Sequence, residues 1–378
     1  MTPNITKWDA ANTAGCTVTN PADEVNAVID ELGDAVDLKI GLFHMGLENE
    51  YGVKDSGCYD MAKDCAELDM ILSSHDHTAI NDYSIGVNDD IPVTQNKNAA
   101  KTIQDIHICM KVKDGKWTVA DIKSKAIDVS KYECDKEMLE VLKPYHEKAC
   151  KVGEEVVGKI ENGIETPGTK TGNVADIFLH DSSVMDLINE VMMYYADADV
   201  SCAAPTRTDS TLKAGKITRS DIANIYKYEN TLYKVEITGA QLKLFMENAA
   251  KYYKTFKKGD KYVEADPDVQ YYLCDMFAGV NYEINISKPV GSRIENLRYS
   301  DGTPVKDSDV LTMAVNNYRV NSCLLIPGLL YEKDDMPKVL EADLGSVREL
   351  IFDYISNVNN GSYTPYCDNN WKLTGIGN

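Results

Sequence analysis

The chain has 378 residues, of which 43% are hydrophobic and 26% are charged, and its formal net charge is −21 at pH 7. Because domains commonly run to roughly 100–200 residues, this length predicts two or more domains. The acidic charge repels phosphate backbones, and no apolar run approaches the roughly 20 residues that span a bilayer. Composition therefore excludes a binder of DNA or RNA polymers and a membrane-spanning protein. The composition is still compatible with the binding of a small anionic ligand in a locally basic pocket.

The ten cysteines are scattered singly and form no Cys-x-x-Cys pair, which argues against a zinc knuckle or a redox motif. They neither require nor exclude disulfides. The first fifteen residues contain no basic segment followed by an apolar stretch, so we predict no signal peptide.

The first chemical pattern is a set of histidines placed after strand-like runs. Residues 36–43 form an apolar run that ends at His44, a helical stretch covers 59–68, and a second run over 69–73 ends before His75 and His77. This order predicts a parallel βαβ unit. Ligands of open α/β sheets bind beyond the carboxyl ends of strands, so we expect the three histidines at one sheet edge. Imidazoles placed there could hold a transition metal, although three unrelated histidines would give the same spacing.

Carboxylates near these histidines give no second signal. Glu48, Asp76 and Asp82 lie nearby in the sequence, but their spacing selects none of them as a ligand. A two-metal phosphoesterase site would also need a bridging carboxylate. We identify no such residue, and therefore no catalytic residue.

The middle of the chain predicts a hairpin and then a helical connector. Apolar alternation on either side of Asp114-Gly115 is typical of a β-hairpin. Residues 131–160 are predicted to be mainly helical, with Pro144 marking a kink or break. A loop over 166–172 then leads into a second domain.

Two segments of the second domain carry candidate ligand-binding residues. Arg207 follows a predicted strand over 199–203, from which a guanidinium could reach a phosphate or a carboxylate with two hydrogen bonds. Tyr228 lies near Asn230, and Tyr318 follows Asn317, as in a clamp that stacks on a base. The alternatives are a surface arginine and half-buried strand tyrosines, and 22 tyrosines in the chain make the second one strong.

The longest informative stretch, residues 198–243 (ADVSCAAPTRTDSTLKAGKITRSDIANIYKYENTLYKVEITGAQLK), resembles the bacterial 2′,3′-cyclic-nucleotide 2′-phosphodiesterase/3′-nucleotidases. These are a branch of the two-domain 5′-nucleotidase family. Further similar stretches are residues 279–305, the AVNNYR segment, SVRELIFDYI and NNWKL. The sequence Ala-Pro-Thr-Arg, which ends at Arg207, favours the cyclic-nucleotide branch over the 5′-nucleotidase and nucleotide-sugar hydrolase branches. The resemblance covers nearly the whole chain.

The resemblance implies a metallophosphoesterase domain that holds two divalent metal ions (Mn, Zn, Mg or Co), a helical connector and a nucleoside-binding C-terminal domain. By position, His44, His75 and His77 match metal ligands of the family. Arg207 matches its substrate-binding arginine, and Tyr228 and Tyr318 match the two aromatic residues that sandwich the base. Asn230 and Asn317 are candidates for polar contacts.

The chain also departs from the family pattern. The family's Asp-x-His motif, bridging Asp and Asn-His-Glu motif have no counterpart in these residues, so residues 1–130 resemble only the later part of the metallophosphoesterase domain. Ser74 replaces the usual glycine before His75, and Val320–Pro327 replaces a glycine-rich loop. We therefore expect an incomplete metal site and a fragment or one part of a split protein, with a missing N-terminal segment or a complementary chain as partner. Half of a sheet sandwich should also expose an apolar face and an unpaired strand edge.

Together these patterns predict a mixed α/β chain. The expected domains are a metallophosphoesterase remnant over 1–130, a connector over 131–165 and a 5′-nucleotidase C-terminal domain over 166–378. The predicted function is metal-dependent hydrolysis of 2′,3′-cyclic nucleotides and 3′-nucleotides in nucleotide catabolism. The alternatives are a non-catalytic nucleotide- or nucleoside-binding module, part of a split enzyme, and a surface protein with a vestigial site. By resemblance the protein acts in the periplasm, at the cell wall or outside the cell.

Overall fold

The structure is a computed structural model that describes residues 1–8, 13, 15–48, 53–82, 91–165 and 170–377. It divides into two compact units, Met1–Val141 and Leu142–Asn378, which are described separately. Helices and several β-sheets occur in both units, which confirms the predicted mixed α/β class. Part of the predicted loop over 166–172, residues 166–169, lies outside the described residues, as does the side chain of Asp82.

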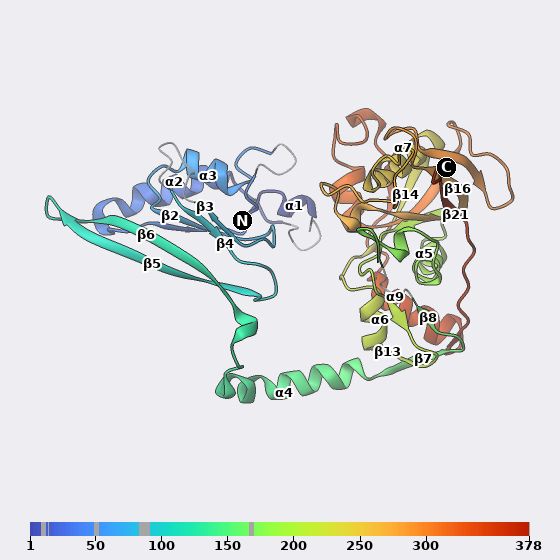
Figure 1. Ribbon diagram of the computed structural model, residues 1–378, viewed down its shortest axis with the longest axis horizontal. Coiled ribbons are helices and arrows are strands. Elements are labelled where there is room, and N and C mark those ends of the chain that lie inside the picture. Colours follow the sequence, from blue (N-terminus) through green and yellow to red (C-terminus); the bar gives the residue numbers. More distant parts are fainter. Residues whose placement is uncertain (9–12, 14, 49–52, 83–90, 166–169, 378) are drawn as a thin grey trace. The chain divides into compact units, whose positions relative to one another are not determined.

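The first unit is built on a small sheet with strand order β1-β2-β4-β3, followed by a hairpin of β5 and β6 (Figure 1). β1 pairs in parallel with β2, and α3 connects the two strands, as the βαβ prediction requires. β4 is parallel to β2, and β3 is antiparallel to β4. The elements are α1 Ile5–Trp8, α2 Pro21–Leu32, β1 Ile40–Leu42, α3 Cys58–Asp64, β2 Met70–Ser73, β3 Ile80–Asp82, β4 Val93–Gln95, β5 Thr102–Lys113 and β6 Lys116–Asp128.

Local sequence signals explain where α2 begins and ends. Asn20 is the N-cap, and its side-chain oxygen accepts hydrogen bonds from the backbone N–H groups of Ala22 and Asp23. Pro21 occupies the first helical position, where its missing N–H costs nothing. The helix ends at Leu32, and the C-cap residue Gly33 has a positive φ of 47°, which glycine adopts readily.

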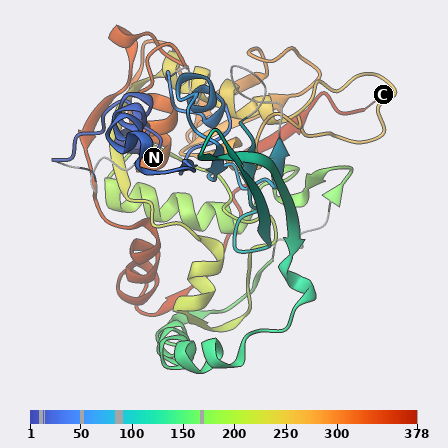
Figure 2. The ribbon, with the colours of Figure 1, turned by 90° about the vertical axis from the view of Figure 1, so that its left-hand side faces the viewer.

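The predicted hairpin is confirmed as the antiparallel pair of β5 and β6 (Figures 1 and 2). Asp114 and Gly115 both have positive φ, which is the requirement of the tight turn that matches the strand twist. The hairpin is anchored to the small sheet because Gln104 donates hydrogen bonds to the backbone carbonyls of Ile80 and Gln95.

The first unit exposes apolar side chains at its sheet edge. Among the described strands, β1 pairs with β2 alone, and Leu42 on β1 is 80% exposed. Ile40 on the same strand and Trp117 on β6 are also exposed. The expected exposed apolar surface and unpaired edge are therefore present in the described part of the unit.

The predicted connector is helical over α4, Lys136–Gly153, but its last residues are not helical. Pro144 lies inside α4 and does not break it, because the flanking Glu, Lys and Leu residues are good helix formers. Residues 156–160 form a strand, β7, and not the end of a helix, since two adjacent valines favour extended backbone.

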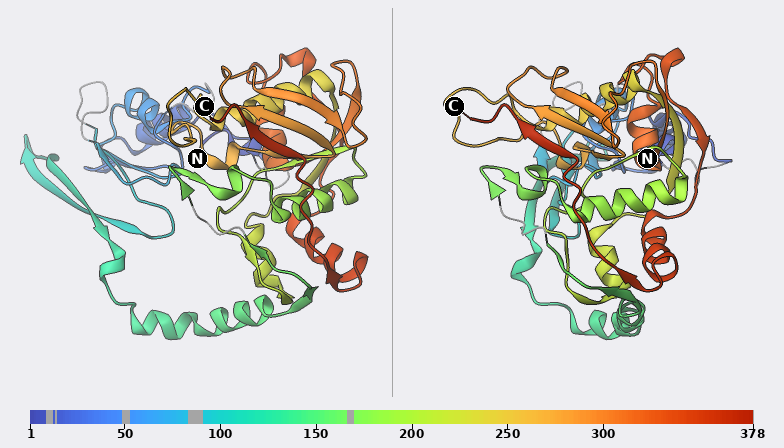
Figure 3. Two further views of the ribbon diagram at one scale, coloured as in Figure 1. Left: turned by 45° about the vertical axis from the view of Figure 1, so that its right-hand side comes forward. Right: turned by 90° about the vertical axis from the view of Figure 1, so that its right-hand side faces the viewer.

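The second unit is organised around a five-stranded sheet with order β15-β11-β18-β14-β19. α5 packs against β11, β14, β15 and β18, and its inward residues belong to a large apolar core (Figure 3). Smaller sheets have the orders β13-β7-β20 and β17-β16-β21. The strands are β7 Val156–Ile160, β8 Ile164–Glu165, β9 Lys170–Thr171, β10 Val174–Ala175, β11 Val200–Ala203, β12 Thr211–Leu212, β13 Gly215–Thr218, β14 Leu232–Thr238, β15 Met276–Ala278, β16 Val280–Asn285, β17 Ile294–Tyr299, β18 Val310–Asn316, β19 Lys338–Glu341, β20 Ser362–Tyr363 and β21 Trp371–Thr374.

The helices of the second unit begin at recognisable caps. Thr218 and Thr238 each form a capping box, in which the threonine oxygen and the side chain three residues later satisfy each other's backbone N–H groups. The helices are α5 Ser183–Ala196, α6 Arg219–Ile225, α7 Gly239–Ala249, α8 Asn317–Arg319 and α9 Val347–Asp353. In the described part of the chain, no helix combines the length and apolar character needed to cross a bilayer.

Candidate functional site

His44 and His75 lie side by side at the carboxyl edge of the small sheet. β1 and β2 are parallel, with Leu42 opposite Leu72, so the loops that follow them leave at the same edge. The two imidazole rings are 5.5 Å apart between centroids and meet edge to face. His77 is on the same loop as His75 and is exposed.

Ser74 holds the His44 ring. Its Oγ lies 3.1 Å from the carbonyl oxygen of Phe43 and 3.0 Å from Nδ1 of His44. If the hydroxyl donates to the carbonyl, Oγ accepts from Nδ1–H and the lone pair of the imidazole is on Nε2. The serine that departs from the family's glycine therefore orients one of the predicted metal ligands.

The loop that carries the other two histidines has an unusual backbone. His75 has a φ of 80° and His77 a φ of 60°, and left-handed conformations are uncommon for residues with a side chain. Asp76 between them accepts a hydrogen bond from the backbone N–H of Leu47 at 2.7 Å, which ties the loop to the segment after β1. Strained backbone of this kind is often found at functional sites.

The donor chemistry fits a divalent transition metal, but the described residues do not form a complete ligand set. Imidazole nitrogens suit such ions, and His44 and His75 are adjacent. Among the described residues, however, only Asp181, Asp186 and Cys367 bring three potential ligand atoms within 4.8 Å of one another, and they lie in the second unit. The three histidines therefore remain a predicted, incomplete site.

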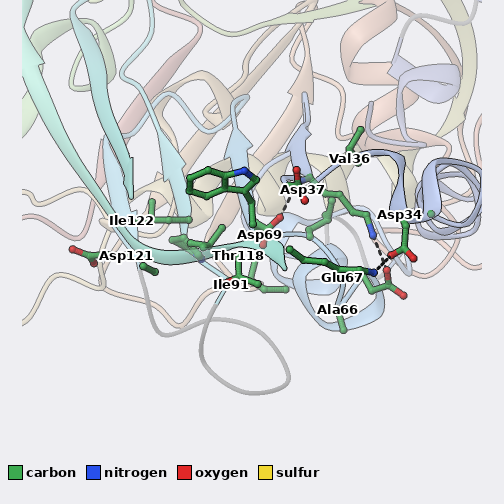
Figure 4. A pocket seen from close by; sticks show the side chains of 18 residues that line it. Asp34, Val36, Asp37, Ala66, Glu67, Asp69, Ile91, Thr118, Asp121 and Ile122 are labelled. Atoms are coloured by element: carbon green, nitrogen blue, oxygen red, sulfur yellow. Dashed lines mark hydrogen bonds and ion pairs between the residues drawn. The ribbon is translucent and has the colours of Figure 1, made fainter. Parts of the chain in front are cut away.

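The first unit also contains a pocket of about 800 Å³ (Figure 4), and no histidine lines it. Its walls come from the segments just before β1, β2 and β4 and from β6. Ion pairs join Lys116 to Asp34 and Lys39 to Glu67 at its rim. It thus opens at the amino ends of the parallel strands, whereas ligands of such sheets bind at the carboxyl ends. We assign no function to it.

In the second unit, strand direction brings the predicted substrate residues to one edge of the five-stranded sheet. β11 and β18 are parallel, so Arg207 and Tyr318, which follow them, lie at the same edge. β14 is antiparallel to β18, and its first residue pairs with the last residue of β18. Tyr228 and Asn230, which precede β14, therefore lie at that edge too.

Two further tyrosines, which no sequence pattern singled out, join this edge. β15 is antiparallel to β11, and its first residue pairs with the last residue of β11, so Tyr271 and Tyr272 just before β15 lie beside the Arg207 loop. Burial, together with the nearby hydroxyls of Tyr318 and Tyr228, raises the pKa of Tyr272. Burial likewise raises the pKa of Tyr318, with Tyr228 adding to the effect. The only sequence signal was a tyrosine pair ahead of a short apolar run.

Arg207 is exposed and already has an ionic partner. Its Nε and Nη2 atoms donate to Oδ1 and Oδ2 of Asp209, each at 3.0 Å. These bonds lower the pKa of the Asp209 carboxyl.

The two predicted amides are engaged with neighbouring groups. The backbone N–H of Asn317 donates a hydrogen bond to the carbonyl of Thr231 at 2.8 Å. In return, the side-chain Oδ1 of Asn317 accepts a hydrogen bond from the backbone N–H of Thr231 at 3.1 Å. Asn230 donates to the hydroxyl of buried Tyr226 at 3.4 Å. In this structure both amides therefore support the loops that carry the tyrosines.

The replaced loop after Arg319 is packed and helical. Val320–Leu324 forms a π-helical turn, and Val320, Cys323 and Leu324 are buried. This turn continues α8, so the segment that carries Tyr318 is anchored in the core.

Residues 156–327 match the sequence profile of the family described as 5′-nucleotidase, C-terminal domain. This part of the chain is therefore similar to the C-terminal domain of 5′-nucleotidases. It contains Arg207, Tyr228 and Tyr318, and it also contains the newly found Tyr271 and Tyr272.

Curated relatives confirm the predicted resemblance. The chain is 25% identical over 437 residues to a 2′,3′-cyclic-nucleotide 2′-phosphodiesterase/3′-nucleotidase of Haemophilus influenzae, covering 99% of the chain and 64% of that protein. It is 23% identical over 425 residues to the trifunctional nucleotide phosphoesterase protein YfkN of Bacillus subtilis, covering 99% of the chain and 28% of that protein. The chain thus spans less than two thirds of each relative.

Solved structures share the fold. A Staphylococcus aureus protein assigned as a 5′-nucleotidase, solved with α-ketoglutarate, matches 98% of the chain and 71% of its own, with a TM-score of 0.73 and 21% identity. A 5′-nucleotidase precursor from Thermus thermophilus matches 95% of the chain and 68% of its own, with a TM-score of 0.53 and 16% identity. These likenesses show that the chain shares a fold with solved 5′-nucleotidase structures.

Proposed function

We propose that the chain is the nucleoside-binding part, together with a portion of the phosphoesterase part, of a metal-dependent hydrolase of nucleotide phosphoesters. The substrate class that we favour is 2′,3′-cyclic nucleotides and 3′-nucleotides, the class named for the Haemophilus influenzae relative. The observation that carries the proposal is the gathering of Tyr228, Tyr318 and Tyr272 with Arg207 at one sheet edge.

In this proposal the tyrosine rings stack on the base and hold the nucleoside in one orientation, which lowers the entropy cost of the reaction. His44, His75 and His77 would hold a divalent ion at the carboxyl edge of the small sheet. Such an ion, when bound, supplies Lewis-acid polarisation of a phosphoryl oxygen. Asp76 and Ser74 keep the histidine loops in place.

Adenosine binding by the 378-residue chain tests the nucleoside site. Tyr228→Ala should weaken binding about 5-fold or more, because base–aromatic stacking contributes roughly 1–3 kcal/mol. Tyr262→Ala is the matched control: the two tyrosines are 45% and 44% exposed, and each ring faces the lysine that precedes it. Calorimetry that finds equal affinities for wild type and Tyr228→Ala would refute the clamp.

A second candidate is a nucleoside-binding module without turnover. It is favoured by one observation, namely that the described histidines do not form a complete ligand set. Release of product from 2′,3′-cyclic AMP with added Mn²⁺ separates the two functions, because a binding module retains adenosine affinity and releases none. The location outside the cytoplasm stays a prediction from the resemblance.

A further inference from the structure

The guanidinium of Arg207 is covered by a carboxylate of its own loop. Asp209 accepts two roughly equal hydrogen bonds, from Nε to Oδ1 and from Nη2 to Oδ2, both at 3.0 Å. The side chains are 44% and 56% exposed, so a ligand from solvent can reach both. A carboxylate and a phosphate offer the same pair of oxygens to an arginine fork. Asp209 therefore fills the position that an anionic ligand group would take.

The short loop holds this pair next to the tyrosines. Thr206 is buried, its hydroxyl donates to the carbonyl of Ile225 at 3.1 Å, and it accepts from the N–H of Lys227 at 3.2 Å. Tyr271 donates to the Thr206 carbonyl at 3.4 Å. The loop is thus fastened to the segment that carries Tyr228, and the charges of Arg207 and Asp209 both act on the nearby Tyr271.

We infer that Asp209 is an internal competitor for Arg207, which sets the preference of this site between uncharged nucleosides and phosphate-bearing nucleotides. The inference rests on the proposed nucleoside site and deepens it. A nucleoside binds beside the neutral Arg207–Asp209 pair without disturbing it. A phosphate group binds Arg207 only after it displaces Asp209, and it is repelled by that carboxylate while the pair is closed.

The expected effect is moderate because the pair is exposed. Exposed ion pairs are weak and are screened by salt, so removal of the competitor should tighten phosphate binding by about 3- to 10-fold at low ionic strength. Adenosine affinity should stay unchanged, because a neutral ligand does not compete for the guanidinium.

The test compares the 378-residue wild type with Asp209→Asn, which keeps the side-chain size and removes the charge. Glu332→Gln removes one exposed negative charge elsewhere in the second unit and serves as control. Inorganic phosphate, adenosine 3′-monophosphate and adenosine are titrated into each protein by NMR, and melting temperatures verify that each variant is folded. We expect Asp209→Asn alone to gain affinity for the two phosphate-bearing probes, with a smaller gain at high salt.

A double variant tests whether the gain in phosphate affinity of Asp209→Asn depends on Arg207. In an Arg207→Gln background, Asp209→Asn should give no gain for phosphate, because the group that the carboxylate covers is gone. Three outcomes overturn the inference. In the first, the gain in phosphate affinity persists without Arg207. In the second, it equals the gain from Glu332→Gln, and in the third there is no gain, including the case of no measurable phosphate binding. The adenosine arm reports separately on the proposed function: a phosphate gain without adenosine binding supports the internal competitor and rejects the nucleoside clamp.

Discussion

The side chains of Arg319 and Asp275 form a buried ion pair, with Nε 2.9 Å from Oδ2 and both side chains no more than 5% exposed. Nη2 of the same arginine donates to the backbone carbonyl of Tyr272 at 2.6 Å. Arg319 directly follows Tyr318, so this arginine ties the segment after β18 to the segment before β15. The ion pair therefore fixes the two tyrosines relative to each other.

Asp275→Asn should destabilise the second unit by about 3–5 kcal/mol, because it leaves the Arg319 charge buried without its partner. The double variant Asp275→Asn/Arg319→Met should lose less, since no buried charge remains. Urea unfolding measures both. The exposed pair Lys254–Glu264 provides the control: Glu264→Gln should cost less than about 1 kcal/mol. Equal costs for Asp275→Asn and Glu264→Gln would contradict the role of the buried pair.

Tyr272→Ala should weaken adenosine binding about 5-fold or more, because it removes one aromatic wall of the site. Tyr272→Phe keeps the ring and should retain the affinity. Calorimetry at one pH and ionic strength provides the comparison, with Tyr194→Ala as an exposed-tyrosine control. If Tyr272→Phe loses as much as Tyr272→Ala, the hydroxyl and not the ring makes the contact.

The proposed metal site predicts that the loops carrying His44, His75 and His77 bind Mn²⁺. His75→Ala/His77→Ala should lower Mn²⁺ affinity by about 10-fold or more, and Ser74→Gly should lower it less, since it only frees the His44 ring. Electron paramagnetic resonance of free Mn²⁺ gives the affinities independently of turnover. His180→Ala in the second unit is the control. Unchanged Mn²⁺ binding in the double variant would exclude these loops as the site.

Asp186 should make stability depend on pH. Its carboxyl is buried beside Asp181 and Asp368, with the Cys367 thiol in the same cluster. Burial, and then repulsion from these carboxylates, raises the pKa of Asp186 to about 7. Because this pKa is raised above its ordinary value near 4, the stabilising contribution is complete below that value and is lost as pH rises through about 7.

Asp186→Asn removes this titration and should therefore gain stability relative to wild type between about pH 5 and about pH 8, by on the order of 2 kcal/mol. Thermal unfolding of both proteins at the two pH values measures the difference. Asp334→Asn, which changes an exposed carboxylate of the second unit, is the control. A constant difference between wild type and Asp186→Asn at both pH values would show that this carboxyl does not titrate as described.

The elements that the sequence predicted well are governed by local signals. Asp114-Gly115 specifies the hairpin turn through its backbone preference, and the alternation of short apolar runs with a helix specifies the βαβ unit that ends at His44 and His75. Pro144 does not break α4 because the rest of that segment forms a helix readily. β7 was missed because the charged helix before it continues directly into a valine-rich strand.

Local patterns in the sequence are sufficient to place these elements, the relation to the nucleotidases, and the residues at the ends of β11 and β18. The contact between Asp209 and Arg207 joins close neighbours in the chain and depends on their side-chain conformations. The position of Tyr271 and Tyr272 beside Arg207, and the pairing of Arg319 with Asp275, depend on the fold. The physical reason is that strand order in a sheet depends on pairing between segments far apart in the chain, and neither local backbone preference nor hydrophobic period encodes which strands become neighbours.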